Sequence, residues 1–243
     1  MKKGVKYLIA ALSLALLICV CALVDNAAAA RRHLVTCNNV EIRLRDTLNL
    51  LAEDDVRNFL DRACPALIGQ RIDSIRLYQV EKVLETRSAV RTAEAWATAD
   101  GVLHIDITQR DPVARFVYGA DAFYIDGTGF IFPMQGNCRK SIPAFEWAAA
   151  PVDTAQEPFL DMITYMEKHR LTGQFPTIRV EKDGELVLIP AEGKERFIFG
   201  KPERLQEKFA AIADYYKKIT GSREDVAYRT VNVKYRGQII CRK

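Results

Sequence analysis

The side chains that most often carry catalysis or bind metals are scattered along this chain of 243 residues. The histidines are His33, His104 and His169, which fall in separate predicted elements, whereas a metal site needs converging ligands. No serine sits in a G-x-S-x-G elbow, and there is no P-loop. Asp126 to Gly129 reads D-G-T-G, but no helical pattern follows it, so it predicts a turn. The sequence therefore predicts a non-catalytic protein without cofactor or metal; an exported hydrolase whose carboxylates meet only after folding is the alternative.

Cysteine usage leaves two possibilities open. Of six cysteines, Cys19 and Cys21 fall in an apolar N-terminal run. The other four, Cys37, Cys64, Cys138 and Cys241, are widely spaced and form no CxxC, which argues against zinc. They allow three disulfide connectivities, and free buried thiols fit equally well.

Composition and charge are those of an ordinary folded protein. Hydrophobic residues make up 49% of the chain, charged residues 27%, and the net charge is +4. The basic residues are not clustered in the sequence, so no nucleic-acid partner is indicated, and nothing suggests a small-molecule substrate.

The N-terminal segment predicts a membrane anchor. Residues 1–6 carry three lysines, and residues 7–24 then run for eighteen positions without a charge. A helix of that length reaches about 27 Å, close to the roughly 30 Å of a bilayer core. The lysines predict a cytoplasmic tail over 1–6, a transmembrane helix over 7–24 and an exported remainder that begins with a linker over 25–33. The alternative is a cleaved signal peptide, because Ala28-Ala29-Ala30 offers a cleavage site.

Residues 34–110 predict a small domain with the order strand, helix, helix, strand, strand. The spacing of Val56, Phe59, Leu60 and Ala63 predicts the first helix. The predicted segments are, in order, a strand at Val40–Leu44, helices around residues 56–63 and 77–84, and strands at Val90–Ala99 and Val102–Arg110 joined by Asp100-Gly101. In the last strand Leu103, Ile105 and Ile107 are expected in the core, with His104, Asp106 and Thr108 in water; Trp96 is expected to pack on the sheet.

Residues 111–243 predict a second, β-rich domain, which gives an α+β fold overall. Its amphipathic helix near the C-terminus should open at Pro202 and end with a cap at Gly221. The predicted segments are, in order, strands at Arg115–Tyr118 and Phe123–Phe132, an irregular stretch at 137–151, a short helix around 159–166, a hairpin about Asp183-Gly184, a strand at Arg196–Phe199, the helix from Pro202, and terminal strands at 226–234 and 238–241.

Several motifs stand in the order seen in one family. Gln109-Arg110-Asp111-Pro112-Val113-Ala114 fits an E/Q-R-x-P-x-A pattern, and Tyr124 to Gly129 fits the "hD-x-x-G" strand that follows it. Val231 to Tyr235 is similar to a terminal "hDLRY" strand, with Asn232 and Lys234 as mild departures. The chain resembles the FtsQ/DivIB family of bacterial cell-division proteins, which consist of an anchor, a POTRA domain with the order β-α-α-β-β and a β domain.

The resemblance implies a non-catalytic, single-pass scaffold of the divisome in the inner membrane. Its N-terminus would lie inside the cell and its bulk in the periplasm at the division septum, where FtsB and FtsL-like partners bind. The implied partner-binding residues are Tyr216, Val231, Val233, Tyr235, Gln238 and Ile240. The domain junction is expected at Arg110, Asp111 and Pro112. A cleaved periplasmic POTRA protein that acts like a chaperone or assists outer-membrane assembly is the alternative.

Overall fold

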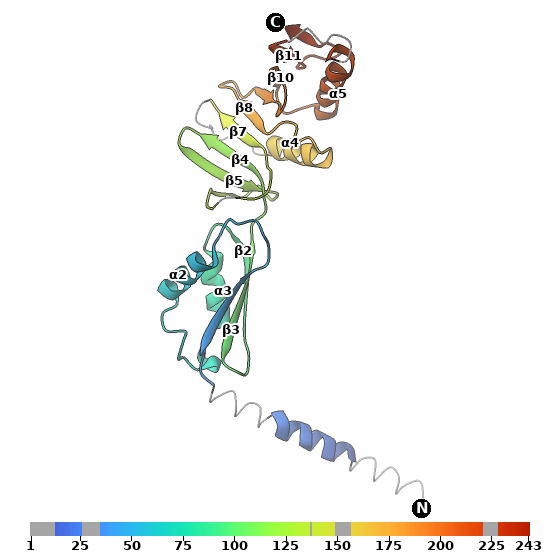
Figure 1. The fold of residues 1–243 in the computed structure, drawn as a ribbon. Helices are drawn as coiled ribbons and strands as arrows, with labels where there is room; N and C mark the ends of the chain where they lie inside the picture. The colour runs from blue at the N-terminus through green and yellow to red at the C-terminus, as the bar shows by residue number, and fades with distance from the viewer. Residues whose placement is uncertain (1–12, 26–34, 137, 149–156, 221–227) are drawn as a thin grey trace, which may run out of the picture. The chain divides into compact units, whose positions relative to one another are not determined.

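The computed structural model describes residues 13–25, 35–136, 138–148, 157–220 and 228–243 (Figure 1). The chain forms two compact units. The first comprises Met1–Arg45 and Ala52–Thr108, and the second comprises Asp46–Leu51 and Gln109–Lys243. Both helices and strands occur in each unit, which confirms the predicted α+β class.

The first unit has the predicted order of elements. Its strands form a sheet in the order β1-β3-β2, in which β1 and β3 run parallel with Val40 opposite Leu103. The elements are β1 (Asn39–Leu44), α2 (Glu53–Ala63), the single 3₁₀ turn η1 (Ile72–Ser74), α3 (Leu77–Glu85), β2 (Val90–Ala97) and β3 (Val102–Gln109). The apolar stripes of the helices face the core, since Val56, Leu60, Val80 and Leu84 are all buried.

The other face of this sheet differs from the prediction in one residue. Asp106 was expected in water but is only 7% exposed, because Arg45 Nε pairs with its Oδ2 at 3.0 Å and Arg43 Nε lies 3.5 Å from its Oδ1. The two guanidinium groups make burial of the carboxylate tolerable. Trp96 stacks on His104 with ring centroids 5.3 Å apart, as expected for sheet packing.

The second unit is built on a nine-stranded sheet. The strand order is β12-β11-β10-β9-β8-β7-β4-β5-β6, so β12 and β6 are its edges. The strands are β4 (Pro112–Tyr118), β5 (Asp121–Asp126), β6 (Ile131–Pro133), β7 (Ala144–Trp147), β8 (Thr177–Val180), β9 (Leu186–Ile189), β10 (Arg196–Gly200), β11 (Thr230–Asn232) and β12 (Ile240–Arg242). Both predicted Asp-Gly turns in this unit, at 126–127 and 183–184, connect neighbouring antiparallel strands.

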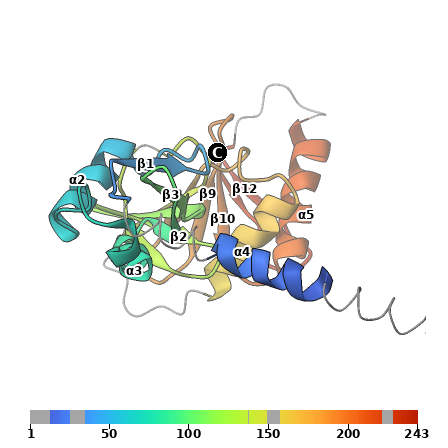
Figure 2. The same cartoon turned by 90° about the horizontal axis from the view of Figure 1, so that it is seen from below.

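Two helices cover one face of this sheet. In Figure 1, α4 (Glu157–Lys168) lies beside β4, β7 and β8, and α5 (Leu205–Tyr215) lies beside β10 and β11. Figure 2 shows the same cartoon from below. Phe159 and Met162 of α4, with Phe209 and Ile212 of α5, belong to one continuous core with the strands. This core is why the apolar spacing of both helices appears in the sequence.

The stretch expected to be irregular contains a central strand. Residues 144–147 form β7, which pairs in parallel with both β4 and β8. The prediction was wrong because four residues after Pro143 are too few to show a clear period, and only pairing with β4 and β8 makes them a strand. Residues 137 and 149–151 of that stretch lie outside the described residues.

The C-terminal elements are shorter than predicted. The helix begins at Leu205 instead of Pro202, because Arg204 adopts φ of 52° and interrupts the helical backbone before it. After Tyr215 the chain continues as one π-helical segment, Tyr216–Thr220, and the expected cap at Gly221 lies outside the described residues. Strand β11 begins only at Thr230, and residues 226 and 227 are likewise not described.

The N-terminal helix is described only in part. Residues 13–25 are helical, while residues 7–12 of the predicted 7–24 span lie outside the described residues. Within the described ranges, no helix combines the length and apolar character needed to traverse a bilayer.

Candidate functional site

The C-terminal edge of the large sheet is an open strand edge. Strand β12 pairs with β11 on one side, with Val231 opposite Cys241 and Asn232 opposite Ile240. On its other side no described strand follows, because β12 ends the order of the sheet. Such an edge offers backbone N–H and C=O groups to a partner strand.

Five of the six residues predicted to bind a partner divide into two groups. Val231 and Val233 are 0% and 2% exposed and belong to the core, so their side chains cannot contact a partner. This corrects their predicted role: they hold the strand in place. Tyr235 is 51% exposed, Ile240 is 39% exposed, and Gln238 is exposed as well.

Tyr216 is half-buried beside Phe197, whose ring centroid lies 5.6 Å away. Burial raises the pKa of its hydroxyl, and a hydrogen bond to the Glu195 carboxylate adds to the shift. Tyr216 therefore supports the end of α5 and already has an acceptor inside the protein.

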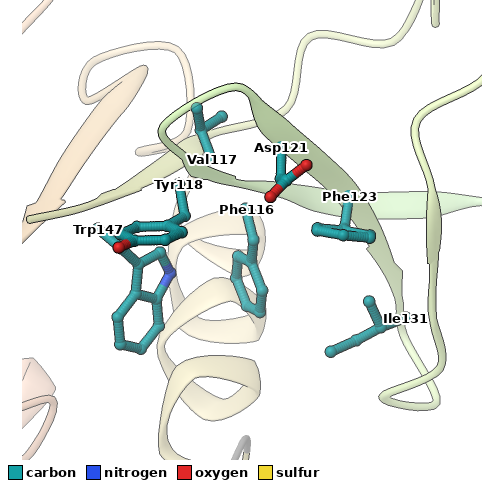
Figure 3. Close-up of a pocket in the computed structure, with 7 residues that line it drawn as sticks. All are labelled: Phe116, Val117, Tyr118, Asp121, Phe123, Ile131 and Trp147. Carbon is teal, nitrogen blue, oxygen red and sulfur yellow. The ribbon is translucent and has the colours of Figure 1, made fainter. Parts of the chain in front are cut away.

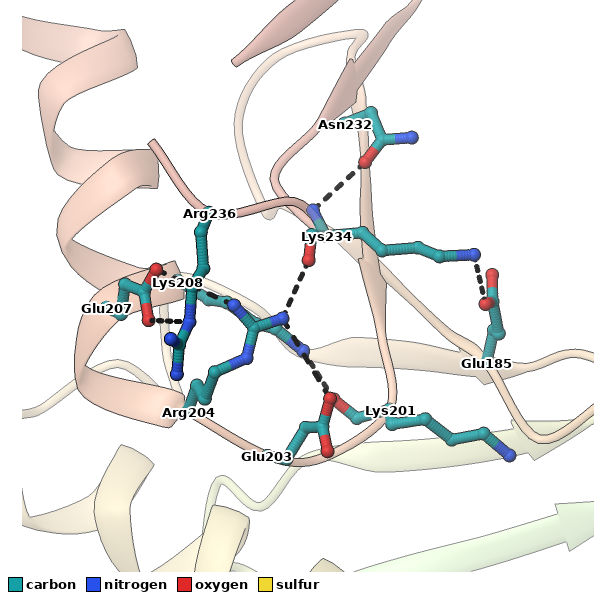
Figure 4. Close-up of polar contacts among 9 residues, drawn as sticks. All are labelled: Glu185, Lys201, Glu203, Arg204, Glu207, Lys208, Asn232, Lys234 and Arg236. Atoms are coloured by element: carbon teal, nitrogen blue, oxygen red, sulfur yellow. Dashed lines mark hydrogen bonds and ion pairs between the residues drawn. The ribbon is translucent and has the colours of Figure 1, made fainter. Parts of the chain in front are cut away.

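A polar network holds the turn between β11 and β12, residues 233–239, against the start of α5 (Figure 4). Arg204 Nη2 donates to the Lys234 carbonyl at 2.9 Å, and Arg204 Nη1 lies 3.6 Å from Glu207. Arg236 approaches the same Glu207 at 3.7 Å, while Lys234 Nζ pairs with Glu185. Sequence patterns miss Arg204, because a bond to a main-chain carbonyl leaves no sequence signature, and they miss Glu185, because its partner Lys234 lies 49 residues away.

The departures from the family pattern at 232 and 234 keep the local geometry. Asn232 Oδ1 accepts a hydrogen bond from the Lys234 backbone N–H at 2.9 Å, a role that an aspartate carboxylate can fill in the same way. The Lys234 side chain packs over Gly200, where an added Cβ would meet Lys234 Cγ at 3.2 Å. Gly200 has φ of +73°, so glycine suits this position in both conformation and space.

A buried lysine lies on α5, close to this turn. Lys208 is 2% exposed, and its Nζ donates to the Lys201 carbonyl at 2.7 Å while lying 4.8 Å from the centre of the Phe199 ring. Burial, and then the charge of Arg204, lowers the pKa of Lys208. The amine connects α5 to the residue that follows β10.

A ring of cations surrounds a hollow at the ends of strands β10, β11 and β12, where Arg196, Thr230 and Arg242 lie side by side. The hollow measures about 630 Å³, and Tyr228 and Thr230 also line it. We call this the basic rim; its cations are Lys194, Arg196, Arg229, Arg242 and Lys243. In the part of the chain that the structure describes, none of these five side chains forms an ion pair, so the rim presents net positive charge to an approaching partner.

The three residues predicted at the domain junction form their contacts within the second unit. Arg110 Nη1 pairs with Asp126 Oδ2 at 3.0 Å and its guanidinium lies 3.9 Å from the centre of the Phe130 ring. Asp111 pairs with Lys140 at 2.9 Å, and Pro112 begins β4.

Gln109, which precedes them, connects a separate segment. Its Oε1 accepts from the backbone N–H groups of Leu50 and Leu51, and its Nε2 donates to Asp46 Oδ1. The segment Asp46–Leu51 thereby packs with the second unit although it precedes most of the first in sequence.

Metal ligands do not gather anywhere in the described ranges: no group of three or more His, Cys, Asp or Glu side chains could hold an ion there. The four cysteines beyond the N-terminal helix are present as free thiols, and burial raises the pKa of Cys64 and Cys241.

Comparison with protein families defines the class of both units. Residues 35–108 match the POTRA-like domain, and residues 111–242 match the family described as FtsQ/DivIB, C-terminal related. No individually curated protein matches the chain. A POTRA-like unit followed by this β domain is the domain order of the bacterial FtsQ/DivIB cell-division class.

The chain belongs to the FtsQ/DivIB family, and its role is in bacterial cell division.

Proposed function

We propose that this chain is a non-catalytic, membrane-anchored scaffold of the divisome that takes up a strand of an FtsB-like partner at the β12 edge. An FtsL-like protein would accompany that partner, and the complex would support septum assembly. The observation that carries the proposal is the open edge of β12 beside the exposed Tyr235, Gln238 and Ile240. Partner strands gain main-chain hydrogen bonds at such an edge, while neighbouring side chains provide specificity.

The rigid surroundings of the edge support this function. Core packing of Val231 and Val233 fixes β11, and the contacts of Arg204, Glu207 and Glu185 fix the turn that carries Tyr235. A partner therefore meets a surface that is already ordered, which lowers the entropic cost of binding.

The basic rim indicates the charge of the partner. Its five cations form no ion pair among the described residues, so a partner segment with acidic residues next to its β strand is favoured. Charge pairs at the rim of an interface mainly raise the association rate and weaken as salt screens them.

The test of this function is Ile240→Asp. We expect capture of the extracytoplasmic FtsB–FtsL-like complex to weaken by about tenfold or more, because a carboxylate would enter an apolar contact and repel an acidic partner. Binding would be followed by biolayer interferometry at several salt concentrations, and the unsubstituted chain should bind less tightly as ionic strength rises. Ile68→Asp is the matched control, since Ile68 is 63% exposed in the first unit. Equal capture by the two variants would contradict docking at β12.

Anchoring through residues 7–24 is part of the proposal. The lysines of residues 1–6 would stay in the cytoplasm, and the two units would lie outside it at the division septum. We expect intact-mass spectrometry of the membrane fraction to find the chain with its N-terminal segment. Loss of about thirty residues would support the signal peptide instead.

A further inference from the structure

An aromatic hollow lies at the end of the large sheet away from β12. It measures about 240 Å³ and is formed by β4, β5, β6 and β7 (Figure 3). We call it the aromatic pocket; its lining residues are Phe116, Val117, Tyr118, Asp121, Phe123, Ile131 and Trp147.

The register of the strands brings the rings together. Phe116 lies opposite Phe123 on β5 and opposite Phe145 on β7, and Trp147 follows two residues after Phe145 on the same face. Helix α4 covers only part of this face, where Phe159 contacts Trp147 with ring centroids 5.4 Å apart. Beyond that contact Tyr118, Phe123 and Ile131 are 41%, 38% and 37% exposed. Exposed aromatic side chains that gather in one hollow are typical of a binding surface.

Two polar groups in the pocket have no described partner. Asp121 is its only charged residue; it is exposed and forms no ion pair in the part of the chain that the structure covers. Trp147 Nε1 is buried and has no hydrogen-bond acceptor among the described residues. In Figure 3 the indole nitrogen lies on the side of the ring that faces Phe116, and Asp121 lies between Tyr118 and Phe123. Because Nε1 is enclosed, a ligand contacts the faces of the rings, and Asp121 is the polar group that is open to it.

Aromatic ring faces and a carboxylate together recognise a cation that has an apolar stem. The guanidinium of arginine stacks on such rings and donates to a carboxylate in a planar fork. The described part of the protein already shows this combination for an arginine, where Arg110 lies over Phe130 and pairs with Asp126. In the aromatic pocket the rings and the carboxylate are present without the arginine.

We propose that the aromatic pocket binds an arginine side chain from an extended segment of a partner protein. The guanidinium lies among Phe116, Tyr118, Phe123 and Trp147 and pairs with Asp121. This partner differs in charge from the one proposed for β12, where the basic rim selects acidic residues. The two sites lie at opposite ends of one sheet, so one scaffold offers separate surfaces to two partners.

The test uses the full chain in detergent micelles with isotope-labelled tryptophan. The protein has two tryptophans, so the Trp147 indole signal reports on the pocket and the Trp96 signal, from the first unit, is an internal control. The probes are three capped pentapeptides, Gly-Ala-X-Ala-Gly, in which X is arginine, its uncharged isostere citrulline, or glutamate. We expect the arginine peptide to shift the Trp147 signal with millimolar affinity and the citrulline peptide to bind at least about fivefold more weakly, as loss of a cation–π contact and an ion pair predicts.

Two variants locate the site. Asp121→Asn removes the charge and Phe123→Ala removes one ring, and each should weaken arginine-peptide binding about fivefold. Both residues are exposed, so the fold is retained, and Asp214→Asn on α5 is the control for net charge. Capture of the FtsB–FtsL-like complex should not change in either variant. Equal binding of the arginine and citrulline peptides, tighter binding of the glutamate peptide, or an unmoved Trp147 signal would each overturn the proposal.

Discussion

Replacing Phe145 by alanine is expected to destabilise the second unit by about 3–5 kcal/mol, the range for truncating a fully buried phenylalanine. Phe145 is 0% exposed, and its ring packs edge-on against Phe116 and Phe159, with centroids 5.5 and 5.7 Å away. It therefore joins β7 both to its neighbour β4 and to helix α4. Removing the ring leaves a cavity between a central strand and the helix that covers it.

Denaturant unfolding followed by tryptophan fluorescence measures this loss. In a Trp96→Phe background, Trp147 is the only tryptophan and lies in the second unit, so the signal reports on that unit alone. Phe145→Leu is the matched variant; it keeps most of the volume and should cost less than about 1.5 kcal/mol. If Phe145→Ala lowers the unfolding free energy no more than Phe145→Leu does, the ring of Phe145 is not what packs β7 against β4 and α4.

The sequence predicted most elements of the fold because their signals are local. The apolar spacing of Val56 and Leu60 predicts helix α2. The pairs Asp183-Gly184 and Asp126-Gly127 predict the two hairpins. Strand β7 has no such signal. Its four residues become a strand only because β4 and β8 pair with it on both sides, and those partners are about 30 residues away in either direction.

The candidate site was predictable only in part for the same reason. Alternation put Val231 and Val233 on one face, but nothing in the strand itself shows that α5 covers that face. Tyr235 and Ile240, by contrast, are exposed. The basic rim and the aromatic pocket were invisible because each gathers residues from three or more strands.

The second large effect is expected at Asp126. Its Oδ1 accepts from the Thr128 hydroxyl and from the backbone N–H groups of Thr128 and Phe130, while Oδ2 pairs with Arg110 Nη1 at 3.0 Å. Asp126→Ala removes all of these acceptors at once and leaves Arg110 without its carboxylate, so we expect a loss of about 3–5 kcal/mol in unfolding free energy. Asp126→Asn retains Oδ1 and loses only the pairing with Arg110, so about 1–3 kcal/mol is expected.

Asp183→Ala is the matched control, because Asp183 occupies the other Asp-Gly turn of this unit, where its Oδ1 accepts only one backbone bond, from Glu185 at 3.0 Å. Its cost should stay below about 1 kcal/mol, since the bond is exposed to water. A cost at Asp183 equal to that at Asp126 would mean that turn geometry, and not the buried pairing with Arg110, sets the stability.

The pH dependence of the unfolding free energy offers a second way to separate the contribution of the Asp126 carboxylate from that of the turn. Burial of Asp126 opposes ionisation, but the hydrogen bonds from Thr128, Phe130 and Arg110 outweigh it, and the pKa of Asp126 is lowered. As the pH falls, Asp126 therefore takes up its proton at a higher pH in the unfolded chain than in the folded one. The stabilisation is complete above the unfolded pKa of about 3.9 and is lost as the pH falls below that value through the folded pKa. Unfolding free energies measured between about pH 6 and pH 3 should therefore fall less steeply in Asp126→Asn than in the unsubstituted chain, because the amide cannot titrate. Parallel curves for the two proteins would show that ionised Asp126 contributes nothing to the stability of the β5–β6 hairpin.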